Sequence, residues 1–285
     1  MKRVIYSVYV DVPAEEHYGQ SKLKYDTPKK ASVTVNAFKK HYDKLVDSKL
    51  KYANSIGAKF MLFKYDDQYL TFANNFKNDF PELTGYEIIN FYKIHLLYHL
   101  AEKYDEILYL DFDAIPLTKE SFFDRWDLSK GICVYNNNSM VKKDRDVFQS
   151  IRSPSAKYFN CQAMLIDKGL HPKNDVINTG IIGARKEDIF KLDFFGGFKD
   201  TMDLMTKLRN DTSLYPQNIV DMFRYDNETI FSYKINVNKV AIQWLDRRWH
   251  YFFDTQFYIP KETKIIHTVN KDFNTVWRFC EKNNI

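Results

Sequence analysis

Hydrophobic residues recur at two different spacings in the first part of the chain. Runs of β-branched and aromatic residues at 4–10, 59–65 and 107–110 predict three buried strands. Between these runs, apolar residues return every three or four positions, which predicts two amphipathic helices. Strands that alternate with helices are typical of a mostly parallel sheet, so we expect an α/β fold.

The two predicted helices have recognisable ends. A polar, loop-like stretch at 11–30 precedes the first helix, and Gly57 follows it as a C-terminal stop. Thr84 and Glu87 have the spacing of a capping box, so the second helix begins there and is expected to run to Tyr104. The apolar stripe of this second helix consists of Ile89, Lys93, Leu96, Leu97 and Leu100.

The second part of the chain has shorter and less regular patterns. We expect strands at 131–135, 176–184, 240–244 and 264–267, and helices at 198–208 and 227–235. The strand at 176–184 is expected to break at Gly180, and 136–175 is a long polar stretch with few clear elements. Because neither an internal repeat nor a low-complexity linker is found, one domain spanning 1–285 is the simplest interpretation.

The most informative local pattern is ILYLDFDAIP at 107–116, a hydrophobic strand that ends in Asp-x-Asp. Residues i and i+2 of an extended chain project to the same side, so Asp111 and Asp113 are expected to present two carboxylates together. Open α/β sheets bind ligands at the carboxyl ends of their strands. Adjacent carboxylates repel each other unless a cation lies between them, and oxygen ligands select Mg²⁺ or Mn²⁺. The alternative is a solvated strand end that carries two acids.

Lys93 is the second unusual feature, because it falls on the apolar stripe of a helix. Lysine is rarely buried without a partner, so an ammonium aimed at an anionic ligand beside the two aspartates would explain its position. The alternative is a side chain that reaches water from the edge of the stripe. His95 and His99 have metal-ligand spacing but lie on the opposite face, and we expect them at the surface.

Two further groups of polar residues occur near element ends. His267 closes the predicted strand at 264–267, and Lys271 follows four residues later; a structural histidine is the alternative there. Asp226, Asn227 and Glu228 open a predicted helix, where acidic residues commonly act only as N-terminal caps.

Composition and charge exclude several classes of protein. Lys+Arg is 42 and Asp+Glu is 37, giving a net charge of +5 without a basic run, so nucleic-acid binding is not expected. There are only 9 glycines and neither GxGxxG nor GxxxxGK[ST], so a glycine loop cannot hold a pyrophosphate.

The cellular location is inferred from other features. Three dispersed cysteines fit a reducing compartment. With no signal peptide and no long apolar stretch, we expect a soluble cytoplasmic protein.

Taken in chain order, these features resemble GT-A fold glycosyltransferases such as glycogenin and the bacterial lipopolysaccharide galactosyltransferases. ILYLDFDAIP looks like the strand and DxD of that family, and Asn178-Thr179-Gly180 looks like its N-[ST]-G strand. The resemblance implies a Rossmann-like nucleotide-diphospho-sugar transferase fold with a mostly parallel sheet. It also implies a nucleotide-binding half at about 1–115 and a sugar- and acceptor-binding half at about 116–285.

The resemblance further implies roles for individual residues. Asp111, Asp113 and His267 would hold Mn²⁺ or Mg²⁺ against the donor diphosphate. The residues implied in donor binding are Tyr9, Val10, Asp11, Lys93, Asp111, Asn178, Thr179, Gly180 and Lys271. In the family the histidine is followed by Gly and then Lys-Pro-Trp, whereas this chain has HTVNKDF.

The catalytic residues match the family least well. Its Asp-Gln pair overlays best on Asn227 and Glu228, with Asp226 one residue early. The resemblance implies retaining transfer of a hexose from a nucleotide sugar, with UDP-sugar favoured, to a glycan, glycoprotein or glycolipid acceptor. Peripheral membrane contact is compatible with such acceptors. The segments 136–175 and 244–257 are the expected places of acceptor recognition.

Two alternative functions remain open at this point. Haloacid-dehalogenase-like phosphatases also place DxD after a hydrophobic strand, but Thr or Val usually follows the second Asp by two residues, where this chain has Ile115. The other alternative is a non-catalytic member of the fold that binds a sugar or nucleotide without turnover.

Overall fold

A six-stranded sheet in the order β2-β1-β3-β6-β5-β7 forms the centre of the computed structural model, which describes residues 1–12, 28–141, 153–211, 213–254 and 258–285. β1 is parallel to β2 and β3, and β5 is parallel to β7. β6 runs antiparallel to its neighbours β3 and β5. The predicted α/β fold with a mostly parallel sheet is confirmed. The strands are β1 (Arg3–Tyr9), β2 (Lys59–Lys64), β3 (Glu106–Leu110), β5 (Ile132–Asn136), β6 (Ile177–Arg185) and β7 (Ile242–Trp244).

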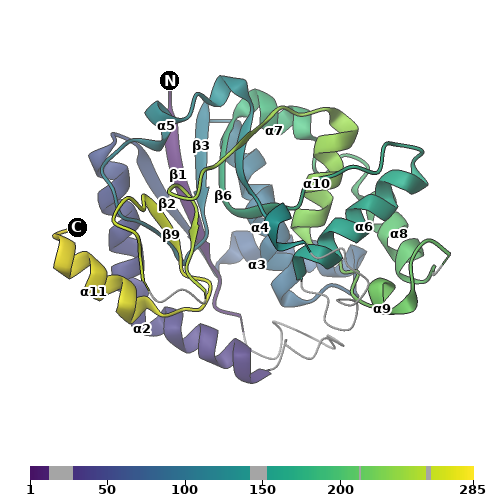
Figure 1. The fold of residues 1–285 in the computed structure, drawn as a ribbon, viewed down its shortest axis with the longest axis horizontal. Helices are drawn as coiled ribbons and strands as arrows, with labels where there is room; N and C mark the ends of the chain where they lie inside the picture. Colours follow the sequence, from purple (N-terminus) through teal and green to yellow (C-terminus); the bar gives the residue numbers. More distant parts are fainter. Residues whose placement is uncertain (13–27, 142–152, 212, 255–257) are drawn as a thin grey trace.

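Helices cover both faces of this sheet (Figure 1). Val4, Tyr6 and Val8 of β1 join the core that contains α4 and α10, whereas Ile5 joins a second core with α2. Because side chains alternate across a strand, β1 must be apolar at nearly every position to serve two cores. The helices named here are α2 (Pro28–Ser55), α4 (Gly85–Ala101) and α10 (Asn227–Asn238).

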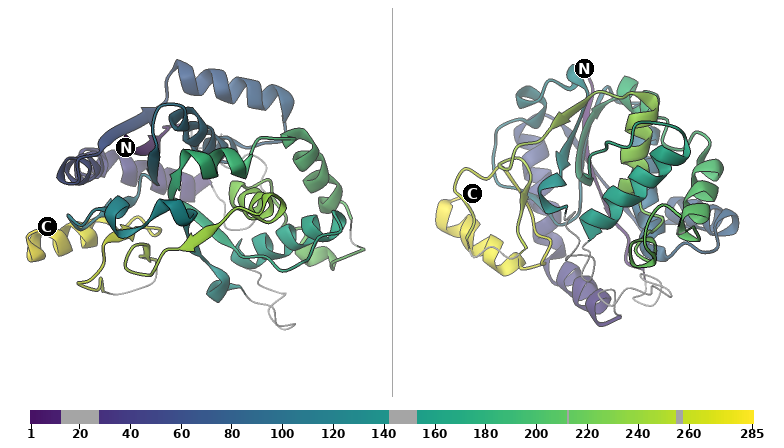
Figure 2. Two further views of the ribbon diagram at one scale, coloured as in Figure 1. Left: turned by 90° about the horizontal axis from the view of Figure 1, so that it is seen from above. Right: turned by 45° about the vertical axis from the view of Figure 1, so that its right-hand side comes forward.

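A second sheet of three short strands lies beside the first, in the order β4-β9-β8. It consists of β4 (Ala114–Pro116), β9 (Ile265–His267) and β8 (Tyr251–Phe252). Antiparallel pairing of β4 with β9 places Ala114 opposite His267. The C-terminal helix α11 (Phe273–Asn283) packs beside α2, as the views of Figure 2 show. This small sheet therefore brings the C-terminal region of the chain to the end of β3.

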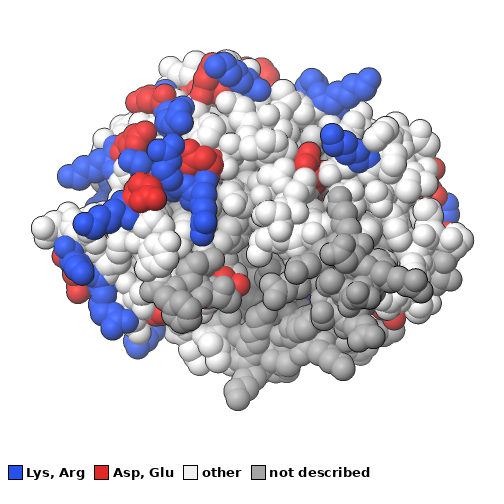
Figure 3. Space-filling model, viewed as in Figure 1, with Lys and Arg blue, Asp and Glu red and all other residues white. Residues whose placement is uncertain are grey.

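The remaining described helices lie around the two sheets. They are α3 (Asp67–Asp79), α5 (Phe122–Arg125), α6 (Ser153–Asp167), α7 (Lys186–Leu192), α8 (Phe198–Arg209), α9 (Gln217–Val220), η1 (Leu128–Lys130) and η2 (Asn138–Met140). Among the helices of the described ranges, none combines the length and apolar character that crossing a bilayer requires. On the face drawn in Figure 3, charged side chains gather on one side, with acids beside bases rather than in a stripe of one sign.

Most of the predicted elements are confirmed within a few residues, but three expectations are wrong. The stretch at 136–175 contains α6, whose polar composition hides its apolar positions; 142–152 lies outside the described residues. β6 continues through Gly180 without a break. The loop expected at 11–30 is wrong for its last three positions, because α2 begins at Pro28; 13–27 also lies outside the described residues. The short strands β4 and β8 and the helices α3 and α11 were not expected.

The capping box that starts α4 is present. Thr84 Oγ1 accepts a hydrogen bond from the Glu87 backbone N–H at 3.2 Å, and Glu87 Oε2 accepts one from the Thr84 backbone N–H at 2.8 Å. These bonds satisfy donors that a helix N-terminus leaves without partners.

We expect Thr84→Ala to lower the free energy of unfolding by about 1 kcal/mol in urea denaturation, because it removes the hydroxyl acceptor of the capping box. Thr84→Ser, which keeps the hydroxyl, should remain close to wild type, and equal losses in both variants would contradict this role.

Candidate active site

The two aspartates of the DxD motif lie in a tight turn between β3 and β4. The Ala114 N–H donates to the Asp111 carbonyl at 2.8 Å and closes the turn. The expectation that an extended chain projects both carboxylates to one side is therefore wrong, because the backbone reverses at this point. The carboxylates nevertheless converge, and together with His267 they place ligand atoms within 4.8 Å of one another. We call residues 111–113 the acidic turn.

His267 reaches the acidic turn through the pairing of β9 with β4. Its Nε2 lies 3.6 Å from Asp111 Oδ2 and 3.5 Å from Asp113 Oδ1. Two carboxylates and one imidazole suit Mn²⁺, since carboxylates are the usual ligands of Mg²⁺ and Mn²⁺ and imidazole favours transition metals. Asp113 and His267 are buried, whereas the Asp111 side chain is 25% exposed. The donor set fits a divalent ion that is reached from the side of Asp111.

Each of the two aspartates also contacts one lysine. Lys93, whose side chain is buried, has its Nζ 3.4 Å from Asp111 Oδ1, and Lys271 forms an ion pair with Asp113. Burial raises the pKa of Asp113, but Lys271 and His267 outweigh this effect and hold the pKa well below its usual range. Lys93 therefore lies beside Asp111, while its expected role toward an anionic ligand stays a prediction. Lys271 also has a left-handed backbone with φ of 61°, which costs a non-glycine residue roughly 1–3 kcal/mol.

Tyrosine hydroxyls fix both Lys93 and Asp111. Tyr109 donates to Asp111 Oδ1 at 2.5 Å, and Tyr6 donates to the Lys93 carbonyl at 2.7 Å. Both rings are buried in the sheet. Sequence analysis did not identify these tyrosines, because aromatic residues in a buried strand look like ordinary core.

His250 supports His267 from the side away from the acidic turn. Its Nε2 lies 3.0 Å from His267 Nδ1, and its ring stacks on Phe252 with a centroid separation of 4.5 Å. Burial, followed by the neighbouring His267, holds the pKa of His250 well below its ordinary value, so its ring is neutral. A metal on His267 Nε2 requires the tautomer in which His267 Nδ1 donates to His250. No sequence signal pointed to His250.

Gly180 packs directly against the ring of His267. A Cβ added at Gly180 would lie 2.4 Å from His267 Cε1 and 2.9 Å from Asn178 Oδ1. The Gly180 carbonyl accepts the Asp111 backbone N–H at 2.8 Å, which ties β6 to the acidic turn. Glycine is thus required here by the close approach of the histidine and not by a break in the strand.

Asp226, Asn227 and Glu228 lie at the start of α10, next to β6. Asp226 is the N-cap and accepts from Thr229 N at 2.9 Å. Asn227 Nδ2 donates to Thr179 Oγ1 at 2.8 Å, and Glu228 Oε1 accepts from Thr179 N at 2.8 Å. The structure therefore brings Asn227 and Glu228 to Thr179 of the predicted N-[ST]-G strand.

Lys157 of α6 forms an ion pair with Glu228 and was not found by sequence analysis. Burial raises the pKa of Glu228, but Lys157 and then Lys93 outweigh it, and the pKa is lowered. By contrast, burial raises the pKa of Asp226. Lys157 thus favours the ionised form of Glu228, whereas burial disfavours that of Asp226.

The predicted base-binding end of β1 borders a cavity of about 530 Å³. Val10 is buried, and Asp11 forms an ion pair with Lys39 at 3.0 Å. The cavity is lined by Tyr9, Asp11, Lys39, Tyr42, Asp43, Lys64 and Tyr65.

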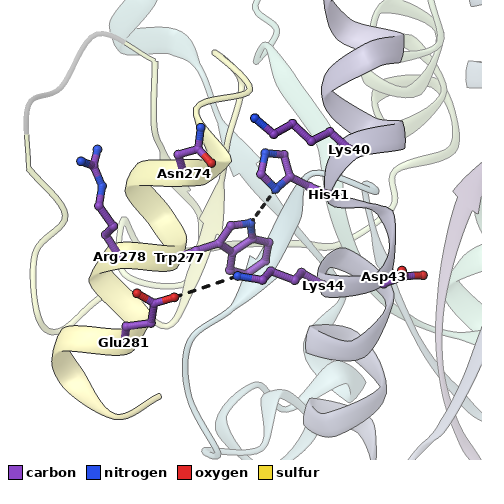
Figure 4. A pocket seen from close by; sticks show the side chains of 8 residues that line it. All are labelled: Lys40, His41, Asp43, Lys44, Asn274, Trp277, Arg278 and Glu281. Carbon is purple, nitrogen blue, oxygen red and sulfur yellow. Dashed lines mark hydrogen bonds and ion pairs between the residues drawn. The ribbon is translucent and has the colours of Figure 1, made fainter.

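A larger cavity of about 750 Å³ lies between α2 and α11 (Figure 4). Trp277 Nε1 donates to His41 Nδ1 at 3.2 Å across it, and Lys44 lies 4.0 Å from Glu281. Asp111, Asp113 and His267 do not line this cavity.

His95 does not belong to the group formed by these three residues. Its half-buried ring lies 4.8 Å from that of Phe72, so the expectation of a surface residue is wrong.

A model described as glycosyl transferase family 8 matches residues 4–192, which is more than half of the chain. No curated protein matches the sequence.

Several solved structures are similar to the chain at low identity. One is a glycosyltransferase involved in the glycosylation of the major capsid of PBCV-1, with 12% identity over 97% of this chain and 100% of that chain, and a TM-score of 0.45. Mouse xyloside xylosyltransferase 1 has 12% identity over 96% of this chain and 99% of that chain, and a TM-score of 0.43. The galactosyltransferase LgtC has 12% identity over 98% of this chain and 94% of that chain, and a TM-score of 0.38.

The contact between Gly180 and His267 predicts a coupled effect on stability. We expect Gly180→Ala to lower the free energy of unfolding by about 1–3 kcal/mol, because the added methyl group displaces the imidazole. In a His267→Ala background the same change should cost clearly less, since most of the clash disappears. A double-mutant cycle in urea without added metal measures this coupling. Additive losses would show that His267 does not confine Gly180.

The ion pair of Lys157 with Glu228 predicts a pH-dependent loss in Lys157→Met. At pH 7 the variant should lose roughly 3–5 kcal/mol, because a buried carboxylate remains without its partner. The lowered pKa of Glu228 contributes stability to the wild type above the unfolded value of about 4.3, and this contribution is lost as pH falls through the folded pKa. In the variant the unpaired carboxylate is protonated more easily, so acid relieves its penalty.

The stability difference between wild type and Lys157→Met should therefore shrink on acidification from pH 7 towards pH 4. Denaturation series at several pH values measure it. The double variant Lys157→Met, Glu228→Gln is the control, because it removes both charges and should lose less at pH 7. A difference that does not change with pH would contradict the assignment.

Proposed function

The chain belongs to glycosyltransferase family 8, and we propose on this basis that it transfers a hexose from a nucleotide-diphosphate sugar in a metal-dependent, retaining reaction. The family assignment makes the protein a glycosyltransferase with the α/β architecture of the GT-A fold. The observation that carries the finer proposal is the convergence of Asp111, Asp113 and His267 within 4.8 Å. We favour a UDP-sugar as the donor.

Asp111, Asp113 and His267 are the residues that would hold Mn²⁺ or Mg²⁺. When bound, the ion would neutralise charge on the donor diphosphate and act as a Lewis acid toward it. Lys93 and Lys271 lie beside the same carboxylates and are placed to bind the phosphate oxygens. As the nucleoside diphosphate departs, negative charge grows on its terminal phosphate, and fixed ammonium groups stabilise that charge as it develops.

The cavity at the end of β1 is the proposed place for the nucleobase. Tyr9 and Tyr42 supply aromatic surface there, with ring centroids 5.0 Å apart, and Asp11 supplies an acceptor. Asn178, Thr179 and Gly180 then line the path from the acidic turn towards α10, where we place the donor sugar.

The hydrogen bonds of the two carboxylates on α10 support a retaining reaction. An inverting enzyme needs a carboxylate base within reach of the acceptor hydroxyl, and a carboxylate already bonded to protein donors is a weaker base. Both oxygens of Asp226 accept bonds from Thr229, and both oxygens of Glu228 are held by Thr179 and Lys157. We therefore assign Glu228 and Asn227 to orientation of β6 and to the electrostatics around the sugar, and Asp226 to capping α10.

The acceptor is proposed to be a glycan, free or carried on protein or lipid. The segments expected to recognise it, 136–175 and 244–257, are described except at 142–152 and 255–257. A haloacid-dehalogenase-like phosphatase is not favoured, since the chain belongs to glycosyltransferase family 8. Sugar transfer in a turnover assay separates a catalyst from a binding-only member of the fold.

Metal-dependent stabilisation by a nucleotide sugar tests the proposed function. We expect at least one UDP- or GDP-sugar to raise the melting temperature of the wild type when Mn²⁺ is present, and to do so much less when it is absent. Asp113→Ala should abolish this shift, because it removes a metal ligand. The control is Asp203→Ala, which removes an exposed acid on α8 that pairs with Lys199 at 2.9 Å. The proposal fails if no nucleotide sugar stabilises the wild type in a metal-dependent manner.

A further inference from the structure

Lys49 of α2 is a fully buried cation behind the acidic turn. Its side chain has an exposed fraction of 0%, and its Nζ donates to the Phe112 carbonyl at 2.8 Å and to the Leu45 carbonyl at 3.3 Å. Within the described ranges, no carboxylate lies within ion-pairing distance of this ammonium. A buried charge without a counter-ion costs free energy, so its position requires an explanation.

The backbone of the acidic turn provides that explanation. The Asp111 carbonyl accepts from Ala114 N at 2.8 Å, and the Asp113 carbonyl accepts from Thr268 N at 3.0 Å. The carbonyl of Phe112 lies between them, and its donor is the side chain of Lys49. Buried carbonyls need a hydrogen-bond partner, so without Lys49 the centre of the turn would lose its anchor.

Lys49 also contacts the ring of Phe112. Its Nζ lies 5.2 Å from the ring centroid, within the range of a cation–π interaction. The same ring packs against Tyr9 at 4.6 Å and Tyr42 at 5.7 Å, and both tyrosines line the cavity at the end of β1. One ammonium therefore holds both the carbonyl and the ring of the residue that joins the two aspartates.

Two opposing effects act on the pKa of Lys49. Burial lowers its pKa to about 7, while Asp113 and then Asp111 act in the opposite direction. A methionine of similar length would fill the same space without a desolvation cost, but it would offer no donor to the turn. Lys49 therefore has a desolvation cost, but its long side chain supplies a donor to the Phe112 carbonyl.

We propose that Lys49 is a positioning residue of the metal site: by holding Phe112, its ammonium keeps Asp111 and Asp113 turned towards His267. This inference rests on the proposed function only in taking the acidic turn to hold a divalent ion. Lys49 does not touch the donor, and its effect passes through the turn.

Two variants with matched chemistry test the proposal. Lys49→Met removes the donor behind the turn, and Lys234→Met is the control. Lys234 is also a buried lysine that donates to a backbone carbonyl, that of Gly196, but it lies towards the C-terminal end of α10, away from the turn. Both variants should lose stability. Only Lys49→Met should weaken Mn²⁺ binding, by roughly 10–100-fold, as is usual for residues that orient metal ligands.

Titration of the folded proteins with Mn²⁺ alone, followed by electron paramagnetic resonance, measures this difference. If the wild type binds Mn²⁺ and Lys49→Met binds it equally well, the inference is overturned while the proposed metal site stands. An equal loss in Lys234→Met would overturn it as well. A wild type that does not bind Mn²⁺ would instead contradict the proposed function.

Hydrogen exchange of the Ala114 amide gives a readout that needs no metal. This amide closes the acidic turn, so its exchange should be faster in Lys49→Met than in Lys234→Met at matched global stability. If Lys49→Met does not fold, Lys49→Gln keeps an N–H donor on a shorter side chain and should show the same changes to a smaller degree. Wild-type exchange at Ala114 in a folded Lys49 variant would overturn the proposal.

Discussion

The pairing of β4 with β9 is the constraint on which the candidate site depends. It joins the acidic turn, which precedes Ala114, to His267, which lies more than 150 residues later in the chain. Because side chains alternate across a strand, a slip of one residue would turn the imidazole away from both carboxylates. The hydrogen bond from Thr268 N to the Asp113 carbonyl, at 3.0 Å, holds the same register.

Around this pairing, charged side chains converge in a chain that has no glycine loop of the kind that many nucleotide-binding proteins use. Only 9 glycines occur in the chain, and no glycine loop is available to hold phosphates. Instead, two carboxylates, His267 and two lysines converge at the end of β3. Gly180 is a glycine that the site does require, since His267 occupies the space where its side chain would be.

Sequence analysis predicted the elements whose patterns are local. The buried strands, the capped helix α4 and the acidic pair after β3 could all be identified from spacing alone. Lys93 was identified because a charge on an apolar stripe needs a partner, and Asp111 is that partner. The family resemblance added His267, whose position depends on a long-range pairing that spacing does not reveal.

The supporting residues could not be predicted, for physical reasons that differ between them. Tyr109 and His250 act through single hydrogen bonds in the core, where their sequence pattern is that of ordinary packing. Lys157 and Lys49 lie on amphipathic helices, and only the tertiary structure shows that their ammonium groups face inwards. The extended geometry expected for Asp111 to Asp113 failed because the Ala114 hydrogen bond closes a turn.

The central claim is that Asp111, Asp113 and His267 hold one divalent ion. Anomalous X-ray scattering from crystals grown with Mn²⁺ and a nucleoside diphosphate tests it most directly. The account predicts a single strong peak within coordination distance of both carboxylates and of His267 Nε2, with the diphosphate oxygens on its open side. A peak elsewhere in the protein, or none at the acidic turn when the nucleotide is bound, would contradict it.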